Sequence, residues 1–174
     1  MGSRTQRPAE NEYANFYATY VTRVPDGDIV QILRDQIEET CTRIEKAGEA
    51  KADFAYAPGK WTVREVIGHL ADGERVFAYR ALRFARADQT PLPGFDETTY
   101  VPAGDFGERS LASLIDEFRA VRAASVKLYE GLPADAWSRS GSANQNSITV
   151  RALAWITAGH ELHHRALLEE RYDL

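Results

Sequence analysis

The sequence predicts an all-α protein, a four-helix bundle with a long crossover loop between its second and third helices and an arm at its N-terminus. Four segments repeat apolar side chains every three or four residues, which is the period of an α-helix. One long connection, residues 88–108, holds three prolines and three glycines between the second and third of these segments. With 174 residues, of which 44% are hydrophobic and 27% charged, the chain can form one globular domain with a sizeable core.

The first 24 residues are expected to form the arm, partly disordered, ahead of a bundle domain over 25–174. Four aromatic side chains in the arm follow the spacing i, i+3, i+4, i+7 of a short helix: Tyr13, Phe16, Tyr17 and Tyr20. An extended arm packed on the bundle fits the same residues. Pro25 and Gly27 then interrupt the chain.

The first two bundle helices are predicted over about 28–46 and 62–86. The first has a buried stripe and a stop at Gly48; the stripe is Ile29, Ile32, Leu33, Ile37, Cys41 and Ile44. Thr62 and Glu65 have the spacing of a capping box, which favours a helix start at that point. The inward residues of this second helix are Val66, Leu70, Phe77, Ala81 and Phe84.

The connection over 88–108 is long enough to run the length of a 20-residue helix, which is about 30 Å. The second and third helices therefore need not form an antiparallel hairpin. The third helix is predicted over 110–131, with Leu111, Leu114, Ile115, Phe118, Val121 and Leu128 facing inward. A polar loop, "SRSGSANQNS", follows, and Thr149 can cap a fourth helix that continues to about residue 171.

Composition excludes several classes of protein. The net charge of -5 argues against a nucleic-acid binder, and the arginines of "ERVFAYRALRFAR" (Arg75, Arg80, Arg83, Arg86) are expected to be solvated or paired with acids. No apolar run reaches the roughly 20 residues that cross a membrane, and the N-terminus lacks the apolar core of a secretory signal. Cys41 is the only cysteine, which rules out an internal disulfide and fits the reducing cytoplasm.

Three of the four histidines lie in one stretch of five residues inside the last predicted helix. His160 and His164 are four residues apart and share its inward face, whereas His163 is turned about 100° away from His164. A divalent metal would bind both neutral rings of a buried pair, although buried or surface histidines without a metal remain an alternative. A His160–His163 pair also stays open.

His69 on the second helix is the candidate third ligand. Gly73, one turn later, either allows close helix packing or clears room for a metal, water or ligand beside His69. Asp72 and Glu65 are candidates for a fourth ligand or a base, Asp72 being the first to test as a general base, although capping or a solvated surface position explains both as well. Glu161 points about 100° away from His160 and is a poor ligand candidate.

Four stretches of the chain carry a family resemblance: "YAPGKWTVREVIGHLADGERVFAYRALRFARAD", "PLPGFDETTYV", "SLIDEFRAVRAASVKLYEGLPADAW" and "ITVRALAWITAGHELHHRALLEERY". Together they resemble the DinB-like (DinB/YfiT) superfamily of metalloenzymes over nearly the whole chain. The resemblance implies a four-helix bundle and a divalent metal, Ni²⁺ or Zn²⁺ before Fe²⁺ or Mn²⁺, held by His69, His160 and His164. It also implies a homodimer and a small-molecule substrate.

Two enzymatic hypotheses and one non-enzymatic hypothesis follow for this open three-histidine site. The first is a transferase in which the metal activates a low-molecular-weight thiol, which then attacks an electrophile. The alternative is a metal-dependent hydrolase that uses metal-bound hydroxide. The third is a metal-binding or stress-response protein without catalysis, which a fourth protein ligand would favour.

Overall fold

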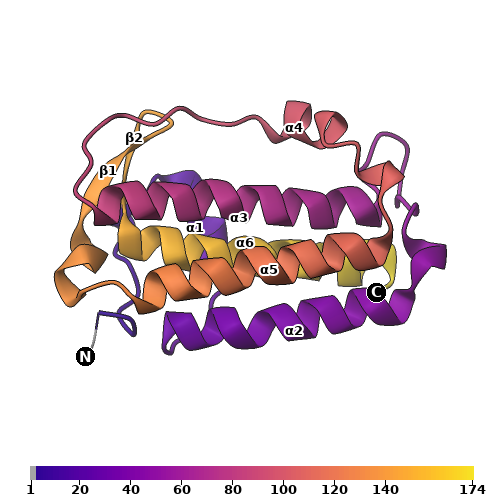
Figure 1. Cartoon of the computed structure of the whole chain (residues 1–174), viewed down its shortest axis with the longest axis horizontal. Coiled ribbons are helices and arrows are strands. Elements are labelled where there is room, and N and C mark those ends of the chain that lie inside the picture. Colours follow the sequence, from indigo (N-terminus) through magenta and orange to yellow (C-terminus); the bar gives the residue numbers. More distant parts are fainter. Residues whose placement is uncertain (1–2) are drawn as a thin grey trace.

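The computed structural model describes residues 3–174 and confirms the four-helix bundle (Figure 1). Its four long helices are α2 (Ile29–Ala47), α3 (Val63–Ala85), α5 (Leu111–Glu130) and α6 (Val150–Tyr172). Residues 1 and 2 of the predicted arm lie outside the described part of the chain. No helix in residues 3–174 combines the length and the apolar character needed to span a membrane.

Helices α3 and α5 run in the same direction, as the length of the connection between them allows. Arg64 near the start of α3 donates to the carbonyl of Arg109, while Glu74 further along α3 binds Arg122. Residues later on α3 therefore contact residues later in the segment that forms α5. The connection crosses from one end of the bundle to the other over α3 (Figure 1).

Helix α6 lies antiparallel to α3 and parallel to α2. His69 contacts His164, whereas Phe77, which is later on α3, contacts His160, which is earlier on α6. Between α2 and α6, Gln36 binds Glu161, and Arg43, which is later on α2, binds Glu169, which is later on α6. The site histidines therefore lie at an α3–α6 contact inside the bundle.

The predicted helix starts are confirmed by side-chain caps. The Thr62 hydroxyl accepts from the Glu65 amide at 3.2 Å, and the Glu65 carboxylate accepts from the Thr62 amide at 2.7 Å. Thr149 likewise accepts from the Ala152 amide at 3.1 Å. Such caps satisfy amides that have no partner inside the first turn.

The long connection is not structureless, which corrects the prediction for 88–108. It forms the short helix α4 (Glu97–Ala103), started by the Asp96 carboxylate on the Thr98 amide, and a 3-10 turn, η4 (Phe106–Glu108). Before α4, Leu92 exchanges two backbone hydrogen bonds with Ser142 and Asn144. A local cap and this pairing order a segment that has no helical periodicity of its own.

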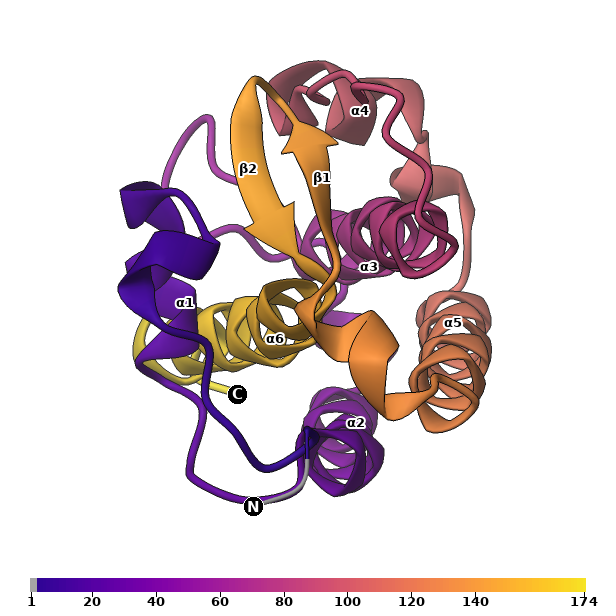
Figure 2. The same cartoon turned by 90° about the vertical axis from the view of Figure 1, so that its left-hand side faces the viewer.

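The predicted polar loop is a β-hairpin, which is a second correction. Strands β1 (Ser140–Ala143) and β2 (Asn146–Thr149) pair antiparallel through a two-residue turn. The turn residues Asn144 and Gln145 have φ values of 49° and 62°, as a type I′ turn requires. In the end view the hairpin rises over the α3–α6 side of the bundle, next to α4 (Figure 2).

The N-terminal segment packs along α6 as short turns rather than as one helix or one extended arm. It forms the 3-10 turns η1 (Glu10–Glu12) and η2 (Asn15–Tyr17) and the single-turn helix α1 (Ala18–Val21). A Cβ on Gly159 of α6 would lie 2.1 Å from the Tyr20 carbonyl oxygen, so glycine permits this close approach.

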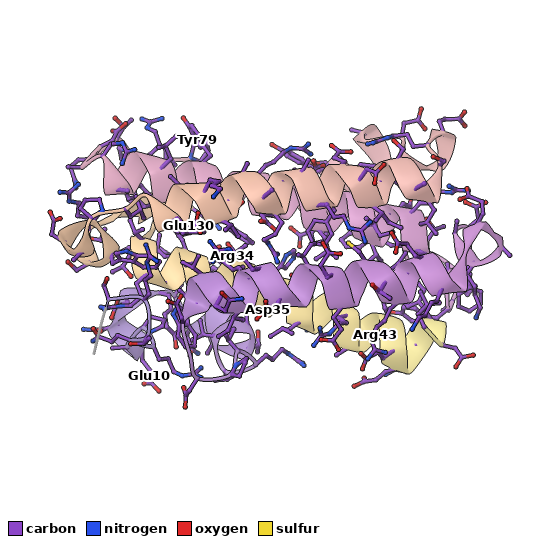
Figure 3. All side chains as sticks on the ribbon, turned by 60° about the horizontal axis from the view of Figure 1, so that its bottom comes forward. Glu10, Arg34, Asp35, Arg43, Tyr79 and Glu130 are labelled. Atoms are coloured by element: carbon purple, nitrogen blue, oxygen red, sulfur yellow. The ribbon has the colours of Figure 1, made fainter. Side chains whose placement is uncertain are left out.

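The buried face of α5 differs from the predicted one at three positions. Val121 and Leu128 are only partly buried, and Arg122 is 1% exposed in the interior beside Phe118. Two carboxylates from neighbouring helices neutralise this arginine, as a buried charge requires. Charged side chains elsewhere cover the outside, including Arg34 of α2 paired with Glu130 of α5 (Figure 3).

Candidate metal centre

Three histidine side chains from two helices meet at the α3–α6 contact. The Nε2 atoms of His69 and His160 lie 2.9 Å apart, and ring nitrogens of His69, His160 and His164 all come within 4.8 Å of one another. Each residue is less than a tenth exposed. Two nitrogens bound to one tetrahedral zinc ion lie about 3.3 Å apart, so the spacing of these three nitrogens fits one divalent ion.

Burial keeps all three rings in the neutral form that binds metals. Desolvation, with a smaller effect of His163, lowers the pKa of His69 to about 4. Desolvation and then the neighbouring histidines lower the pKa values of His160 and His164 well below the ordinary value. Neutral imidazole is the ligand form, so the rings need lose no proton near pH 7 to bind an ion.

Gly73 provides the space in which the His160 ring lies. A Cβ at Gly73 would be 3.0 Å from Cε1 of His160, closer than ordinary contact. This mid-helix glycine therefore allows close packing, because it lets α6 bring the His160 ring against α3. Gly68 serves packing as well, because a Cβ there would meet the Phe106 ring at 2.4 Å.

Aromatic rings hold the cluster from several sides. The Trp61 ring lies 4.7 Å from His69 and 6.4 Å from His164, measured between ring centroids. Tyr20 packs edge-on against His160 at 5.4 Å and Phe77 does so at 5.6 Å. These contacts limit rotation of the imidazoles and exclude water around them.

His163 lies next to the cluster but outside the group whose nitrogens converge. Its ring contacts Tyr20 at 5.4 Å and His164 at 5.1 Å, and its buried Nδ1 has no hydrogen-bond partner within residues 3–174. The structure therefore brings together His160 with His164 and His69, and not His160 with His163.

The cluster forms one wall of a cavity of about 480 Å³. The four histidines line it with six aromatic residues and three polar ones: Phe16, Tyr17, Tyr20, Trp61, Phe77, Phe95, Arg80, Glu97 and Asn144. Arg80 corrects the prediction for the arginines of α3, because it is 3% exposed and has no carboxylate partner among the described residues. The walls belong to α3 and the loop before it, α6, the N-terminal segment, the crossover and the hairpin turn.

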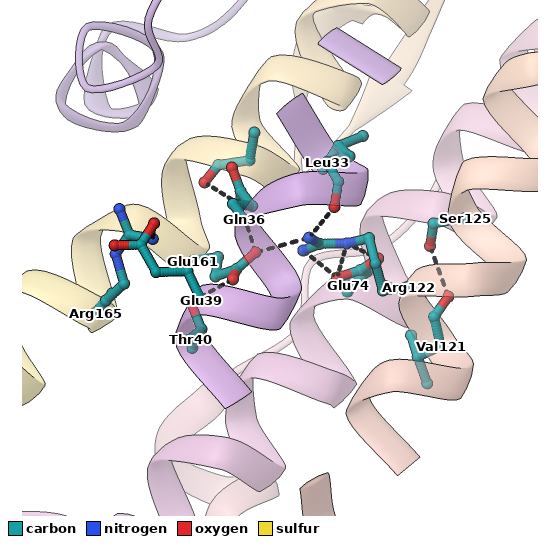
Figure 4. Close-up of polar contacts among 11 residues, drawn as sticks. Leu33, Gln36, Glu39, Thr40, Glu74, Val121, Arg122, Ser125, Glu161 and Arg165 are labelled. Carbon is teal, nitrogen blue, oxygen red and sulfur yellow. Dashed lines mark hydrogen bonds and ion pairs between the residues drawn. The ribbon is translucent and has the colours of Figure 1, made fainter. Parts of the chain in front are cut away.

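A buried polar network joins α2, α3, α5 and α6 (Figure 4), and two of its carboxylates directly follow residues of the site in the chain. Arg122 of α5 makes two hydrogen bonds of 2.8 Å to the Glu74 carboxylate and lies 2.7 Å from Glu161. Gln36 and Thr40 of α2 also donate to Glu161. Glu74 follows Gly73, and Glu161 follows His160, so two carboxylates and one guanidinium leave a formal charge of about -1 beside the cluster.

Asp72 and Glu65 lie apart from the cavity lining. The Asp72 carboxylate is 3.3 Å from Arg75, and burial raises its pKa against the opposing effect of that arginine. Glu65 is engaged in the capping box with Thr62. Within residues 3–174, no carboxylate or thiol joins the three converging histidines, which leaves their outer side facing the cavity.

Sequence reasoning found the histidines and missed Arg80, Trp61 and the buried network. A signal for Arg80 was present, because it follows His69 by eleven residues and returns to within about 20° of it on the helix. The network had a weaker signal: Glu74 and Glu161 each follow a site residue directly. Nothing in the sequence shows that Arg122 reaches both.

The chain is similar to known proteins in sequence and in fold. A protein of Bacillus pumilus (strain SAFR-032), described as a candidate metal-dependent hydrolase, is 25% identical over 125 residues, 70% of either chain. The solved structure of Bacillus subtilis YfiT, described as a candidate metal-dependent hydrolase with an unusual four-helix bundle topology, matches with a TM-score of 0.66 at 18% identity. That match covers 95% of this chain and 90% of YfiT.

A second solved structure, the DinB-like protein YjoA of Bacillus subtilis, shares the fold with a TM-score of 0.62 at 17% identity. It covers 84% of this chain and 90% of YjoA. The family model of the DinB superfamily matches residues 32–168, which include every residue of the histidine cluster and of the buried network. The chain belongs to the DinB superfamily.

Proposed function

We propose that this chain is a metal-dependent enzyme that activates a low-molecular-weight thiol, with a divalent ion held by His69, His160 and His164. The observation that supports it most is the convergence of three buried, neutral histidines on one side of a cavity. Ni²⁺ and Zn²⁺ are the first choices, with Fe²⁺ and Mn²⁺ also possible for nitrogen ligands. An ion bound by three neutral rings supplies uncompensated positive charge that stabilises the anionic form of a nucleophile.

The protein's own residues prepare this site in three ways. Trp61, Phe77 and Tyr20 exclude water and hold the imidazole rings in position. The carboxylates of the buried network offset part of an ion's charge from a distance. The cavity leaves room for the remote parts of a thiol and for its electrophilic partner.

The thiol must come from a substrate. Cys41 is fully buried, and burial raises the pKa of its thiol to about 12, so it stays protonated at neutral pH. It also does not line the cavity. A sulfur nucleophile at this site is therefore a small molecule that enters from solution.

A hydrolase is the second candidate, and the description of the Bacillus pumilus relative favours it. It needs a general base that reaches the cavity. Asp72, the residue predicted for this role, is paired with Arg75, and the thiol reaction therefore needs fewer additional groups. A metal-binding or stress-response protein without catalysis is a third candidate, although the outer side of the cluster faces a cavity rather than a fourth ligand.

The metal assignment is tested by counting metal ions per chain. The wild-type protein is expected to bind one ion, and His69→Ala and His164→Ala to bind far less. His163→Ala is the matched control, since it removes an adjacent imidazole that does not converge with the others. Unchanged metal content in His69→Ala and His164→Ala contradicts the assignment.

The reaction is tested on metal-loaded protein with a panel of bacterial thiols and of simple esters and amides. Calorimetric thiol binding that disappears on chelation supports the transferase. Metal-dependent ester or amide turnover without thiol binding supports the hydrolase. Metal binding with neither supports the non-enzymatic candidate.

We also propose a homodimer in the cytoplasm. An apolar groove between α3 and α5, where Tyr79 and Leu82 are partly exposed, supports the dimer. The single buried cysteine supports a reducing compartment. Light scattering of wild-type and Tyr79→Glu protein tests the dimer, which the charged side chain is expected to dissociate.

A further inference from the structure

We propose that Arg80 binds a carboxylate of the substrate, so that the cavity takes elongated molecules with a metal-binding group at one end and a carboxylate at the other. This inference rests on the proposed metal site and goes beyond it in naming the substrate class. It starts from a buried guanidinium that forms no ion pair with the carboxylates of residues 3–174.

Four arginines in the described residues are buried, and three of them have carboxylate partners. Arg64 binds Asp53 and Glu49, Arg122 binds Glu74 and Glu161, and Arg151 binds Glu12. Arg80 is 3% exposed, yet no carboxylate of residues 3–174 comes within 4.0 Å of it. Buried charges in proteins are normally paired, so an anion from outside is the missing partner.

The neighbours of Arg80 leave most of its donors free. One Nη2–H donates to the Pro93 carbonyl at 3.0 Å, and the guanidinium lies 5.9 Å from the Phe95 ring centre. The Tyr17 hydroxyl is its other polar neighbour, and burial raises the pKa of this phenol, which keeps it uncharged. A guanidinium carries five N–H donors in a planar fork, so a pair suited to a carboxylate remains.

Arg80 and His69 face the cavity from one side of α3, and the other three histidines face it from α6. Arg80 follows His69 by eleven residues, which is about 20° around the helix and about 16 Å along it. The Phe77 ring contacts both His160 and Tyr17 and forms the apolar wall between the two ends.

The charges around the cavity favour a carboxylate over a phosphate. Arg80 is the only lysine or arginine among its described lining residues, and Glu97 adds a negative charge to the same lining. A phosphate dianion would leave net negative charge next to Glu97. A carboxylate has the single charge and the two oxygens that one guanidinium binds.

The test uses hydroxamates, which bind divalent metals whichever reaction the enzyme performs. The probes are linear monohydroxamates of increasing length that end in a carboxylate, each compared with the same molecule ending in a carboxamide. Their affinities for zinc-loaded protein are measured by calorimetry. At the length that spans the cavity, the carboxylate is expected to bind at least about tenfold more tightly, as a charge-assisted pair predicts.

Three variants assign this preference to one residue. Arg80→Met and Arg80→Gln are expected to abolish it while they keep the metal content, and Gln retains a donor for the Pro93 carbonyl if Met impairs folding. Arg83→Met, on the same helix but outside the cavity lining, is expected to keep it. A wild-type protein without the preference at any length, or an Arg80 variant that retains it, overturns the inference.

The outcomes separate this inference from the proposed function. A protein that binds no metal contradicts the proposed function, and the inference with it. A protein that binds metal and hydroxamates without distinguishing carboxylate from carboxamide contradicts the inference alone.

Discussion

The Glu161 carboxylate lies 2.7 Å from Nη1 of Arg122, and the residue before Glu161 on α6 is His160. Arg122 also binds Glu74, which follows the glycine that makes room for the His160 ring. The Arg122 guanidinium therefore binds one carboxylate from each of the two helices, α3 and α6, that carry the histidine cluster. It ties α3, α5 and α6 together at this level, and its bond to the Leu33 carbonyl adds α2 (Figure 4).

Arg122→Met is expected to lower the free energy of unfolding by about 3–5 kcal/mol, because it leaves two buried carboxylates without their cation. Urea denaturation of metal-free protein measures the loss. The matched control is Arg119→Met, since Arg119 forms ion pairs with Glu45 and Glu38 at the surface of the same helix. A loss below about 1 kcal/mol is expected for the control, and equal losses in both variants would contradict this view of the network.

Gly73→Ala is expected to weaken metal binding by roughly tenfold to a hundredfold, as loss of support around a ligand typically does. The added Cβ would lie 3.0 Å from Cε1 of His160 and would move that ring. Alanine favours the helix by about 1 kcal/mol, so the thermal stability of the metal-free protein is expected to stay level or rise. Competition with a coloured chelator measures the affinity.

Gly159→Ala is the comparison, because its Cβ would meet the Tyr20 backbone oxygen at 2.1 Å. A backbone cannot move aside as a side-chain ring can, so this variant is expected to lose stability. If Gly73→Ala also unfolds the protein or leaves the metal affinity unchanged, Gly73 does not serve the His160 ring.

The parts of the fold that could be predicted from the sequence are those encoded locally. Apolar periodicity placed the four long helices, and Thr62 and Thr149 marked two of their starts because caps act within one turn. The 100° rotation per residue separated His160 and His164 from His163, and the structure has the same division.

The parts that could not be predicted depend on contacts between distant segments. Periodicity gives the face of a residue but not its partner, so it could not show that Arg122 binds both Glu74 and Glu161 in the interior. The hairpin turn needed positive φ at Asn144 and Gln145, which that residue pair signals only weakly. The order of the crossover likewise depends on pairing between Leu92 and the hairpin.

Glu65→Ala is expected to leave the metal content unchanged and to reduce stability by about 1 kcal/mol, because Glu65 caps α3 rather than lining the cavity. Thr62→Ala removes the other half of the capping box and is expected to have a similar effect. Metal analysis and thermal denaturation of both variants check this. A loss of metal in Glu65→Ala but not in Thr62→Ala would instead make Glu65 part of the metal centre.

The metal-free protein is expected to lose stability as the pH falls from about 6.5 to about 4. Burial lowers the pKa of His69 from its ordinary 6.5 to about 4, so between these values the unfolded chain binds a proton that the folded chain does not. Stability therefore rises with pH in this window: the contribution of His69 to the free energy of unfolding is fully present above about 6.5 and is lost below about 4. For His69 alone, this change in the free energy of unfolding amounts to about 3 kcal/mol. His160 and His164 contribute changes in the same direction.

Urea denaturation of metal-free protein across this pH range measures the slope. His69→Leu is the informative variant, because it removes one titrating ring and keeps the position apolar. Its slope is expected to be shallower than that of the wild type, since fewer protons are taken up on unfolding. Parallel slopes for the two proteins would mean that His69 is not held neutral by its burial against Trp61 and His160.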